Sequence, residues 1–162
     1  MTFPGRPQIP TIDVHEAAAG QDAVAAGGSA NGGADGGAGA ASGAAAGRVG
    51  GSAGVDGSGG VGGSGAPLLV DVRERNEFIE VRAPGAVLYP TSSFLLRFEE
   101  LPRDRPLHVI CNSGSRSATV TAWLLRNGWT DVHDVAGGMI AWMRAGLETR
   151  RGPLAPGEGD LA

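Results

Sequence analysis

A long stretch of glycine, alanine and serine sets the strongest limit on what this chain can fold into. From about residue 20 to residue 65 most positions are Gly, Ala or Ser, and none is aromatic. Such a composition buries too little apolar surface to offset the entropy lost on ordering. The sequence therefore predicts a low-complexity disordered insert at 20–66 inside one small domain at 7–148, followed by a flexible C-terminal tail at 149–162.

The rest of the chain alternates between short apolar segments and helix-like segments. The apolar runs at 68–72 and 107–110 are continuous, as in strands that are buried on both faces of a parallel sheet. Further strands are predicted at 8–12, 86–89 and 131–135, and helices at 14–19, 74–81, 94–101, 118–126 and 139–145. Strands that alternate with helices through short turns indicate an α/β domain with a mostly parallel five-stranded sheet.

Composition argues against several classes of function. The formal net charge is −4 and the arginines are dispersed, which argues against a nucleic-acid partner. The chain has no lysine, so lysine Schiff-base chemistry is excluded, and its single cysteine allows no internal disulfide and no CxxC site. No segment resembles a membrane span or a secretory leader. We therefore expect a cytoplasmic protein with no membrane partner, no metal and no cofactor.

The only cysteine, Cys111, lies in a loop of small residues between a predicted strand and a predicted helix. Backbone N–H groups converge in such a loop, and the helix dipole and Arg116 add positive charge. These features favour the thiolate, which is the reactive form of cysteine. Asp71 and Arg73 stand at the end of another predicted strand, at 68–72. The carboxyl ends of parallel strands share one edge of a sheet, so we expect both residues at the same edge as Cys111. The sequence thus predicts a nucleophile site at this edge.

Five short segments of the chain occur in a distinctive order and spacing. They are Asp71-Val72-Arg73-Glu74, Asn76-Glu77-Phe78, Pro84-Gly85-Ala86, Cys111-Asn112-Ser113-Gly114-Ser115-Arg116-Ser117 and Val135-Ala136-Gly137-Gly138-Met139-Ile140-Ala141-Trp142. Taken together, they resemble the single-domain rhodaneses, the thiosulfate sulfurtransferase-like family. The resemblance extends over nearly all of the chain outside the predicted insert and the last dozen residues.

This resemblance implies a three-layer α/β sandwich and an enzyme that transfers sulfur through a persulfide. It implies that Cys111 attacks the outer sulfur of thiosulfate, releases sulfite, and passes the sulfur on to cyanide or a thiol. The implied sulfur-binding residues are Asn112, Ser113, Gly114, Ser115, Arg116 and Ser117. Asp71 and Arg73 are expected to brace the loop rather than to react. The implied partners are a small-molecule sulfur donor and a thiol acceptor, and a sulfur-carrier protein is a compatible acceptor.

The sequence departs from the family pattern at one position and leaves two other functions open. Arg82 stands where the family commonly has a histidine, from which we expect altered local packing or specificity. A cysteine-dependent phosphatase or arsenate reductase would use a similar loop with five residues between cysteine and arginine, but only four separate Cys111 from Arg116. A non-catalytic rhodanese-like module that binds a protein partner is the other alternative, and the presence of Cys111 argues against it.

Overall fold

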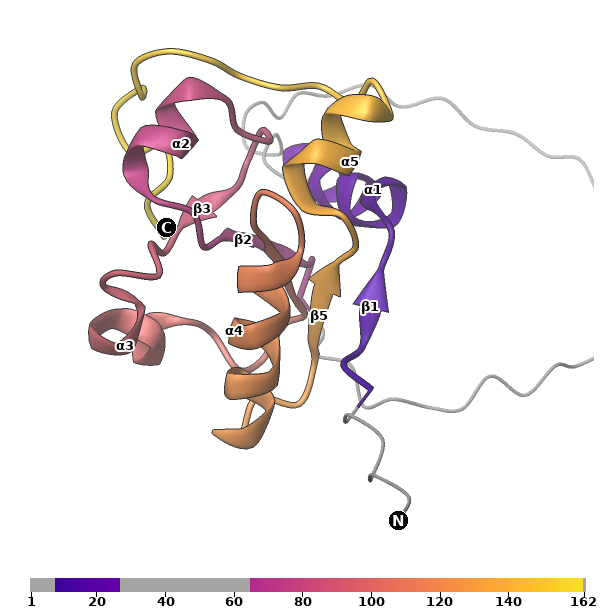
Figure 1. Cartoon of the computed structure of the whole chain (residues 1–162), viewed down its shortest axis with the longest axis vertical. Helices are drawn as coiled ribbons and strands as arrows, with labels where there is room; N and C mark the ends of the chain where they lie inside the picture. Colours follow the sequence, from indigo (N-terminus) through magenta and orange to yellow (C-terminus); the bar gives the residue numbers. More distant parts are fainter. Residues whose placement is uncertain (1–7, 27–64, 162) are drawn as a thin grey trace, which may run out of the picture.

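The computed structural model of the chain describes residues 8–26 and 65–161. At its centre five parallel strands form a sheet in the spatial order β1-β5-β4-β2-β3 (Figure 1). The strands are β1 Thr11–Ile12, β2 Leu68–Asp71, β3 Val87–Leu88, β4 Leu107–Ile110 and β5 Val132–Val135. Both β2 and β4 are buried along their whole length, as expected of strands that are covered on both faces.

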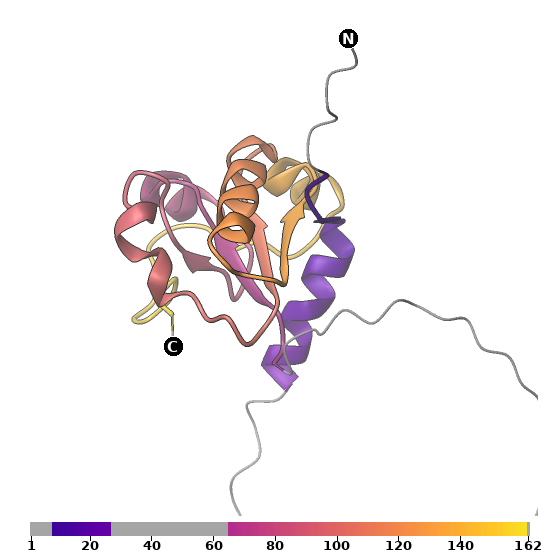
Figure 2. The ribbon, with the colours of Figure 1, turned by 90° about the horizontal axis from the view of Figure 1, so that it is seen from below.

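Helices cover both faces of this sheet and complete three layers. One face carries α1 Val14–Ala26, α2 Arg75–Glu80 and α5 Gly138–Arg144, and the other carries α3 Phe94–Arg97, the 3-10 helix η1 Phe98–Glu100 and α4 Ser115–Arg126. Figure 2 shows α1 and α4 on opposite sides of the strands. The predicted three-layer α/β sandwich is confirmed. Among the helices of the described residues, none is long and apolar enough to cross a membrane.

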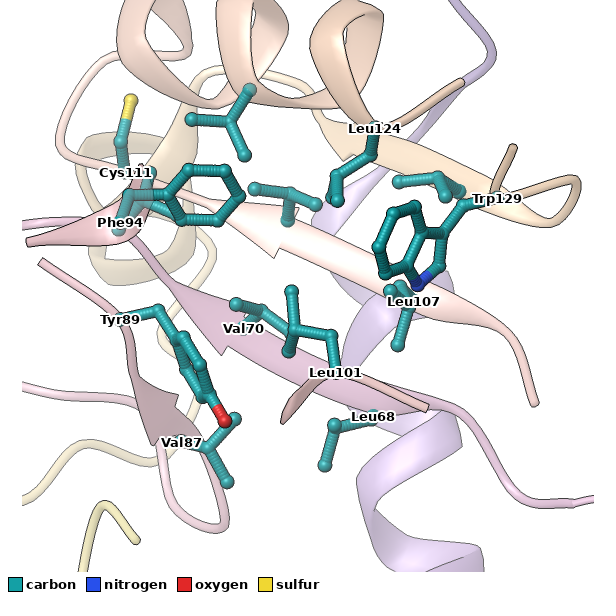
Figure 3. Close-up of a cluster of buried hydrophobic side chains, with 14 residues drawn as sticks. Leu68, Val70, Val87, Tyr89, Phe94, Leu101, Leu107, Cys111, Leu124 and Trp129 are labelled. Atoms are coloured by element: carbon teal, nitrogen blue, oxygen red, sulfur yellow. The ribbon is translucent and has the colours of Figure 1, made fainter. Parts of the chain in front are cut away.

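Each helical layer is held to the sheet by its own apolar cluster. Phe94 and Leu124 belong to the cluster between the sheet and α4 (Figure 3), and Trp142 belongs to the cluster on the opposite face. Successive strand residues point to opposite faces of a sheet, so one strand supplies both clusters. For example, Val109 of β4 packs on the α4 side and Ile110 packs on the other side.

The parallel register brings the carboxyl ends of the central strands to one edge. Asp71 at the end of β2 lies beside Ile110 at the end of β4, and Val109 lies beside Asp134 of β5. The residues that follow these strands therefore emerge next to one another. This is the edge at which parallel α/β sheets bind ligands, and Cys111 is the first residue beyond β4.

The first helix is longer than the sequence predicts. A helix that ends before Gly20 is expected from the sequence, whereas α1 continues to Ala26. Gly20 lies inside this helix at a close approach, since an added Cβ would lie 3.2 Å from the ring of Pro67. The start of the predicted insert is therefore helical, and residues 27–64 lie outside the described residues. The division into a domain at 7–148 and an insert at 20–66 stays a prediction.

The C-terminal residues pack against the domain, whereas the sequence predicts a flexible tail. Arg150 and Arg82 form an antiparallel bridge, with N···O distances of 2.8 and 2.9 Å. The buried Arg82 guanidinium also donates to both carboxylate oxygens of Glu158 at 2.7 Å, and this contact lowers the pKa of Glu158 to about 2. Further along the tail, the carbonyl oxygen of Gly159 accepts a hydrogen bond from the N–H of Leu88 at 2.7 Å. The arginine at the family's histidine position is thus the anchor of the tail.

Candidate active site

Cys111 lies at one end of the apolar cluster between the sheet and α4. The residue is 1% exposed, and its sulfur points away from the packed side chains beside it (Figure 3). The buried strand β4 fixes the position of the cysteine backbone, and the chain then turns within residues 112–114 to enter α4. The thiol is therefore held by a rigid strand on one side and faces a tight loop on the other.

Gly114 allows this loop to turn into α4. Its φ of +97° is a left-handed conformation that residues with a Cβ rarely adopt, and it is the N-cap residue of the helix. The helix begins at Ser115, although the sequence predicts a start at residue 118. Arg116 and Ser117, which the sequence assigns to the loop, are therefore in the first turn of α4, where the backbone N–H groups have no partner within the helix.

Hydrogen-bond donors surround the Cys111 sulfur. The N–H of Gly114 lies 3.1 Å from Sγ and the hydroxyl of Ser117 lies 3.3 Å from it. Burial alone raises the pKa of the thiol, but the hydrogen bonds from the Ser117 hydroxyl and from the backbone N–H groups of Ser117, Gly114 and Ser113 together outweigh burial. The pKa of Cys111 is lowered as a result, and the direction agrees with the expectation from the sequence.

We expect Cys111 of the folded protein to be alkylated at a lower pH than an ordinary thiol. The rate with iodoacetamide follows the thiolate fraction, so its midpoint against pH reports the thiol pKa. The folded protein should give a midpoint below the value of about 8.5 for a free cysteine, because the loop donors stabilise the thiolate. The same protein unfolded in denaturant is the control, with the same thiol and no loop. A folded midpoint at or above the unfolded one would contradict this assignment.

The turn after β5 packs its backbone directly on the cysteine loop. The N–H groups of Met139 and Ile140 donate to carbonyl oxygens of this loop, at 2.8 Å to Cys111 and 3.0 Å to Asn112. This approach requires Gly138, because an added Cβ would overlap the Cys111 carbonyl oxygen and because its φ is +56°. The sequence marks the glycine pair as a turn but does not reveal its contact with the loop.

Arg116 is paired with a carboxylate from another helix. Its Nη1 and Nη2 donate to the two carboxylate oxygens of Glu77 in α2, each at 2.7 Å. Such a two-pronged pair is stronger than a single neutral hydrogen bond, and it lowers the pKa of Glu77 to about 2. These two contacts occupy two of the five guanidinium N–H donors. The sequence shows Glu77 within a family motif, but nothing in it indicates that this residue holds Arg116.

Asp71 and Arg73 form a buried pair beside the end of β4, 0% and 2% exposed. The Arg73 guanidinium lies 2.7 Å from the Asp71 carboxylate and also donates to the carbonyl oxygen of Val81 at 2.7 Å. The pair therefore ties the end of β2 to the end of α2, the helix that carries Glu77. These contacts join the sheet to α2, and neither side chain is open to a substrate. That the pair braces the cysteine loop stays a prediction.

The assembled site is suited to hold negative charge on one sulfur atom. The carboxylates of Asp71 and Glu77 are engaged by Arg73 and Arg116, whereas Sγ of Cys111 faces N–H and O–H donors. Within residues 8–26 and 65–161 no group of three His, Cys, Asp or Glu side chains is placed to hold a metal ion. The site has the features of an activated thiolate nucleophile.

Comparisons with known proteins agree on one family. The family model of the rhodanese-like domain matches residues 61–145. A sulfurtransferase from Allochromatium vinosum is 39% identical over 80 residues, which cover 49% of this chain and 75% of that protein. The thiosulfate sulfurtransferase GlpE from Actinobacillus succinogenes is 35% identical over 80 residues, covering 49% of this chain and 72% of that protein. The crystal structure of a rhodanese-related protein from Thermoplasma volcanium matches with a TM-score of 0.50 at 32% identity, covering 52% of this chain and 84% of that one.

Proposed function

This chain belongs to the family of rhodanese-like domains, which gives it a sulfurtransferase-type function, and we propose that it carries sulfur as a persulfide on Cys111. The names of its relatives support the class of reaction. The single observation that supports the residue is the set of donors from Gly114 and Ser117 around Sγ at the end of a central strand. We propose thiosulfate or a related sulfane-sulfur compound as the donor, and a small thiol or a sulfur-carrier protein as the acceptor.

The proposed reaction consists of two nucleophilic displacements. In the first, the Cys111 thiolate attacks the outer sulfur of thiosulfate, the bond between the two thiosulfate sulfur atoms breaks, and sulfite leaves with the electron pair. In the second, an acceptor thiolate or cyanide attacks the terminal sulfur of the persulfide, and the Cys111 thiolate leaves. Two covalent half-reactions of this kind predict ping-pong kinetics.

The contacts of the cysteine loop favour both displacements. The donors that lower the pKa of Cys111 raise the thiolate fraction for the first step. A thiol with a low pKa is also the better leaving group in the second step. We assign the terminal sulfur of the persulfide to the backbone N–H groups of residues 112–117, and the sulfite end of the donor to the N–H groups of Arg116 that Glu77 leaves free.

Replacement of Arg116 with alanine is expected to raise the KM for thiosulfate about tenfold, with a smaller change in kcat. The change removes a charged hydrogen bond to the donor anion, for which about 1.5 kcal/mol is typical. Steady-state kinetics at varied thiosulfate concentration measure it. Arg126→Ala is the matched control, because Arg126 carries the same charge on the exposed last turn of the same helix. Thiosulfate kinetics that stay unchanged in Arg116→Ala, or that change equally in both variants, would contradict the assigned role.

Formation of thiocyanate from thiosulfate and cyanide tests the proposed function against the two alternatives. A sulfurtransferase forms thiocyanate and does not hydrolyse an aryl phosphate. A phosphatase would show the reverse, although only four residues separate Cys111 from Arg116. A binding module would show neither activity. Either of these last two results would reject the proposal.

A further inference from the structure

Asp134 lies on the side of the sheet that faces the first turn of α4. It belongs to β5 and pairs with Val109 of β4. Side chains two residues apart on a strand share a face, and Val132 packs in the α4-side cluster together with Val109 and Cys111. The Asp134 carboxyl therefore points to the same side of the sheet as the Cys111 sulfur, one strand away. Ser117 of α4 lies above both residues.

The Asp134 carboxyl is buried and incompletely satisfied. The residue is 7% exposed, and its buried Oδ1 has no hydrogen-bond partner. Burial raises the pKa of this carboxyl, and the nearby Ser117 hydroxyl offsets only part of the rise. The residue also lines a groove of about 710 Å³ next to residues 113–115 of the cysteine loop. Protons can therefore reach the carboxyl from solvent without passing through the core.

The Ser117 hydroxyl has two acceptors beside it. It donates to Sγ of Cys111 at 3.3 Å, while it lies close enough to Asp134 to lower the pKa of that carboxyl, whose Oδ1 has no hydrogen-bond partner. A serine hydroxyl has a single proton to donate, so it cannot serve a thiolate and a carboxylate at the same time. Ser117 is 0% exposed, so no solvent lies beside it to donate to the acceptor that its hydroxyl leaves without a hydrogen bond.

We propose that Asp134 is a positioning residue that controls Cys111 through the Ser117 hydroxyl. When the Asp134 carboxyl is protonated, it donates its own proton to the Ser117 oxygen, and Ser117 donates to the thiolate. When the carboxyl is ionised, it accepts the hydrogen bond of the Ser117 hydroxyl. The thiolate then loses that donor and gains a negative neighbour. The two groups therefore titrate as a coupled pair, and ionisation of Asp134 makes Cys111 a weaker acid.

Few other charges face Asp134 from the surrounding elements. The neighbouring strands contribute the Cys111 thiol beyond β4 and only uncharged residues from β1. From α4, Arg126 lines the groove at its exposed end, while Arg116 is engaged by Glu77. Cys111 is therefore the titratable group to which Asp134 couples through Ser117. The consequence for sulfur transfer rests on the proposed function, whereas the consequence for thiol reactivity does not.

Alkylation of Cys111 by iodoacetamide against pH tests the coupling in four proteins. They are the wild type, Asp134→Asn, Ser117→Ala and the double variant. In Asp134→Asn the neutral amide cannot compete with a thiolate for the Ser117 proton, so the alkylation midpoint should fall, and the rate one pH unit below the wild-type midpoint should rise at least threefold. In the Ser117→Ala background the same substitution should produce less than half of this shift.

Asp131→Asn is the matched control, because it removes an equal charge just before the other end of β5. Its alkylation profile should superimpose on the wild type. Thermal unfolding checks each fold, and Asp134→Ser, which is also neutral and can donate, is used if the amide is not accommodated. An unchanged or raised midpoint in both neutral variants overturns the proposal, and so does a shift that persists undiminished without Ser117. If alkylation behaves as expected while no thiocyanate forms, the proposed function fails and this coupling stands.

Discussion

Replacement of Cys111 with serine is expected to lower the rate of thiocyanate formation by at least about a thousandfold, the scale on which loss of a covalent nucleophile acts. Serine nearly preserves the shape of the side chain and can still accept hydrogen bonds from Gly114 and Ser117. It cannot form a persulfide, and its hydroxyl does not ionise near neutral pH. The variant therefore removes the chemistry and keeps the loop.

Two measurements make this result informative. Thermal unfolding should show that Cys111→Ser folds, because the substitution changes one atom of a buried side chain. Ser113→Ala, in the same loop, should retain most of the activity, since it keeps its backbone N–H and loses only a hydroxyl for which the structure shows no contact with the sulfur. Residual transfer above a tenth of the wild-type rate in Cys111→Ser would show that another group carries the sulfur.

Replacement of Gly138 with alanine is expected to destabilise the fold by about 2–4 kcal/mol and to reduce sulfur transfer in the protein that remains folded. The new Cβ would overlap the carbonyl oxygen of Cys111. The alanine would also have to adopt the φ of +56° that Gly138 has. The turn after β5 would have to move away, which breaks the hydrogen bond from Met139 to the Cys111 carbonyl. Denaturant unfolding measures the stability, and the thiocyanate assay measures the activity.

Gly146 offers a closely matched control for Gly138. It has a φ of +70°, but an added Cβ would meet no atom within 4 Å. Gly146→Ala should therefore carry only the backbone strain, about 1 kcal/mol, and should leave the thiol midpoint unchanged. The difference between the two variants isolates the contact with the cysteine loop. Equal losses of stability in both would mean that the close packing of the two loops has no energetic importance.

Features with a local signature could be predicted from the sequence. The continuous apolar runs at 68–72 and 107–110 could be recognised because strands covered on both faces need no polar alternation. Because the strands are predicted to be parallel, their carboxyl ends share one edge of the sheet, and Cys111, Asp71 and Arg73 are expected there. The structure confirms the architecture and places Asp71 beside Ile110, the residue before Cys111, with Arg73 hydrogen-bonded to Asp71.

Features that depend on contacts between distant residues could not be predicted. Glu77 and Arg116 are 39 residues apart, and Arg82 and Glu158 are 76 residues apart. Nothing in the local pattern indicates that each carboxylate binds its arginine, so the sequence predicts a flexible tail and does not reveal the partner of Arg116. The sequence does not indicate a role for Asp134 for a similar reason, because its neighbour Ser117 lies on α4, which packs across β5.

We propose that Cys111 carries sulfur, and the mass of the intact protein is the measurement that decides this. Reduced wild-type protein is incubated with thiosulfate, and in parallel with glutathione persulfide, and then freed of the donor. We predict an added mass of one sulfur atom, located at Cys111, absent from Cys111→Ser and removed by cyanide with formation of thiocyanate. If neither donor adds mass to protein whose Cys111 is still alkylated by iodoacetamide, Cys111 does not carry sulfur from these donors and the proposed function is rejected.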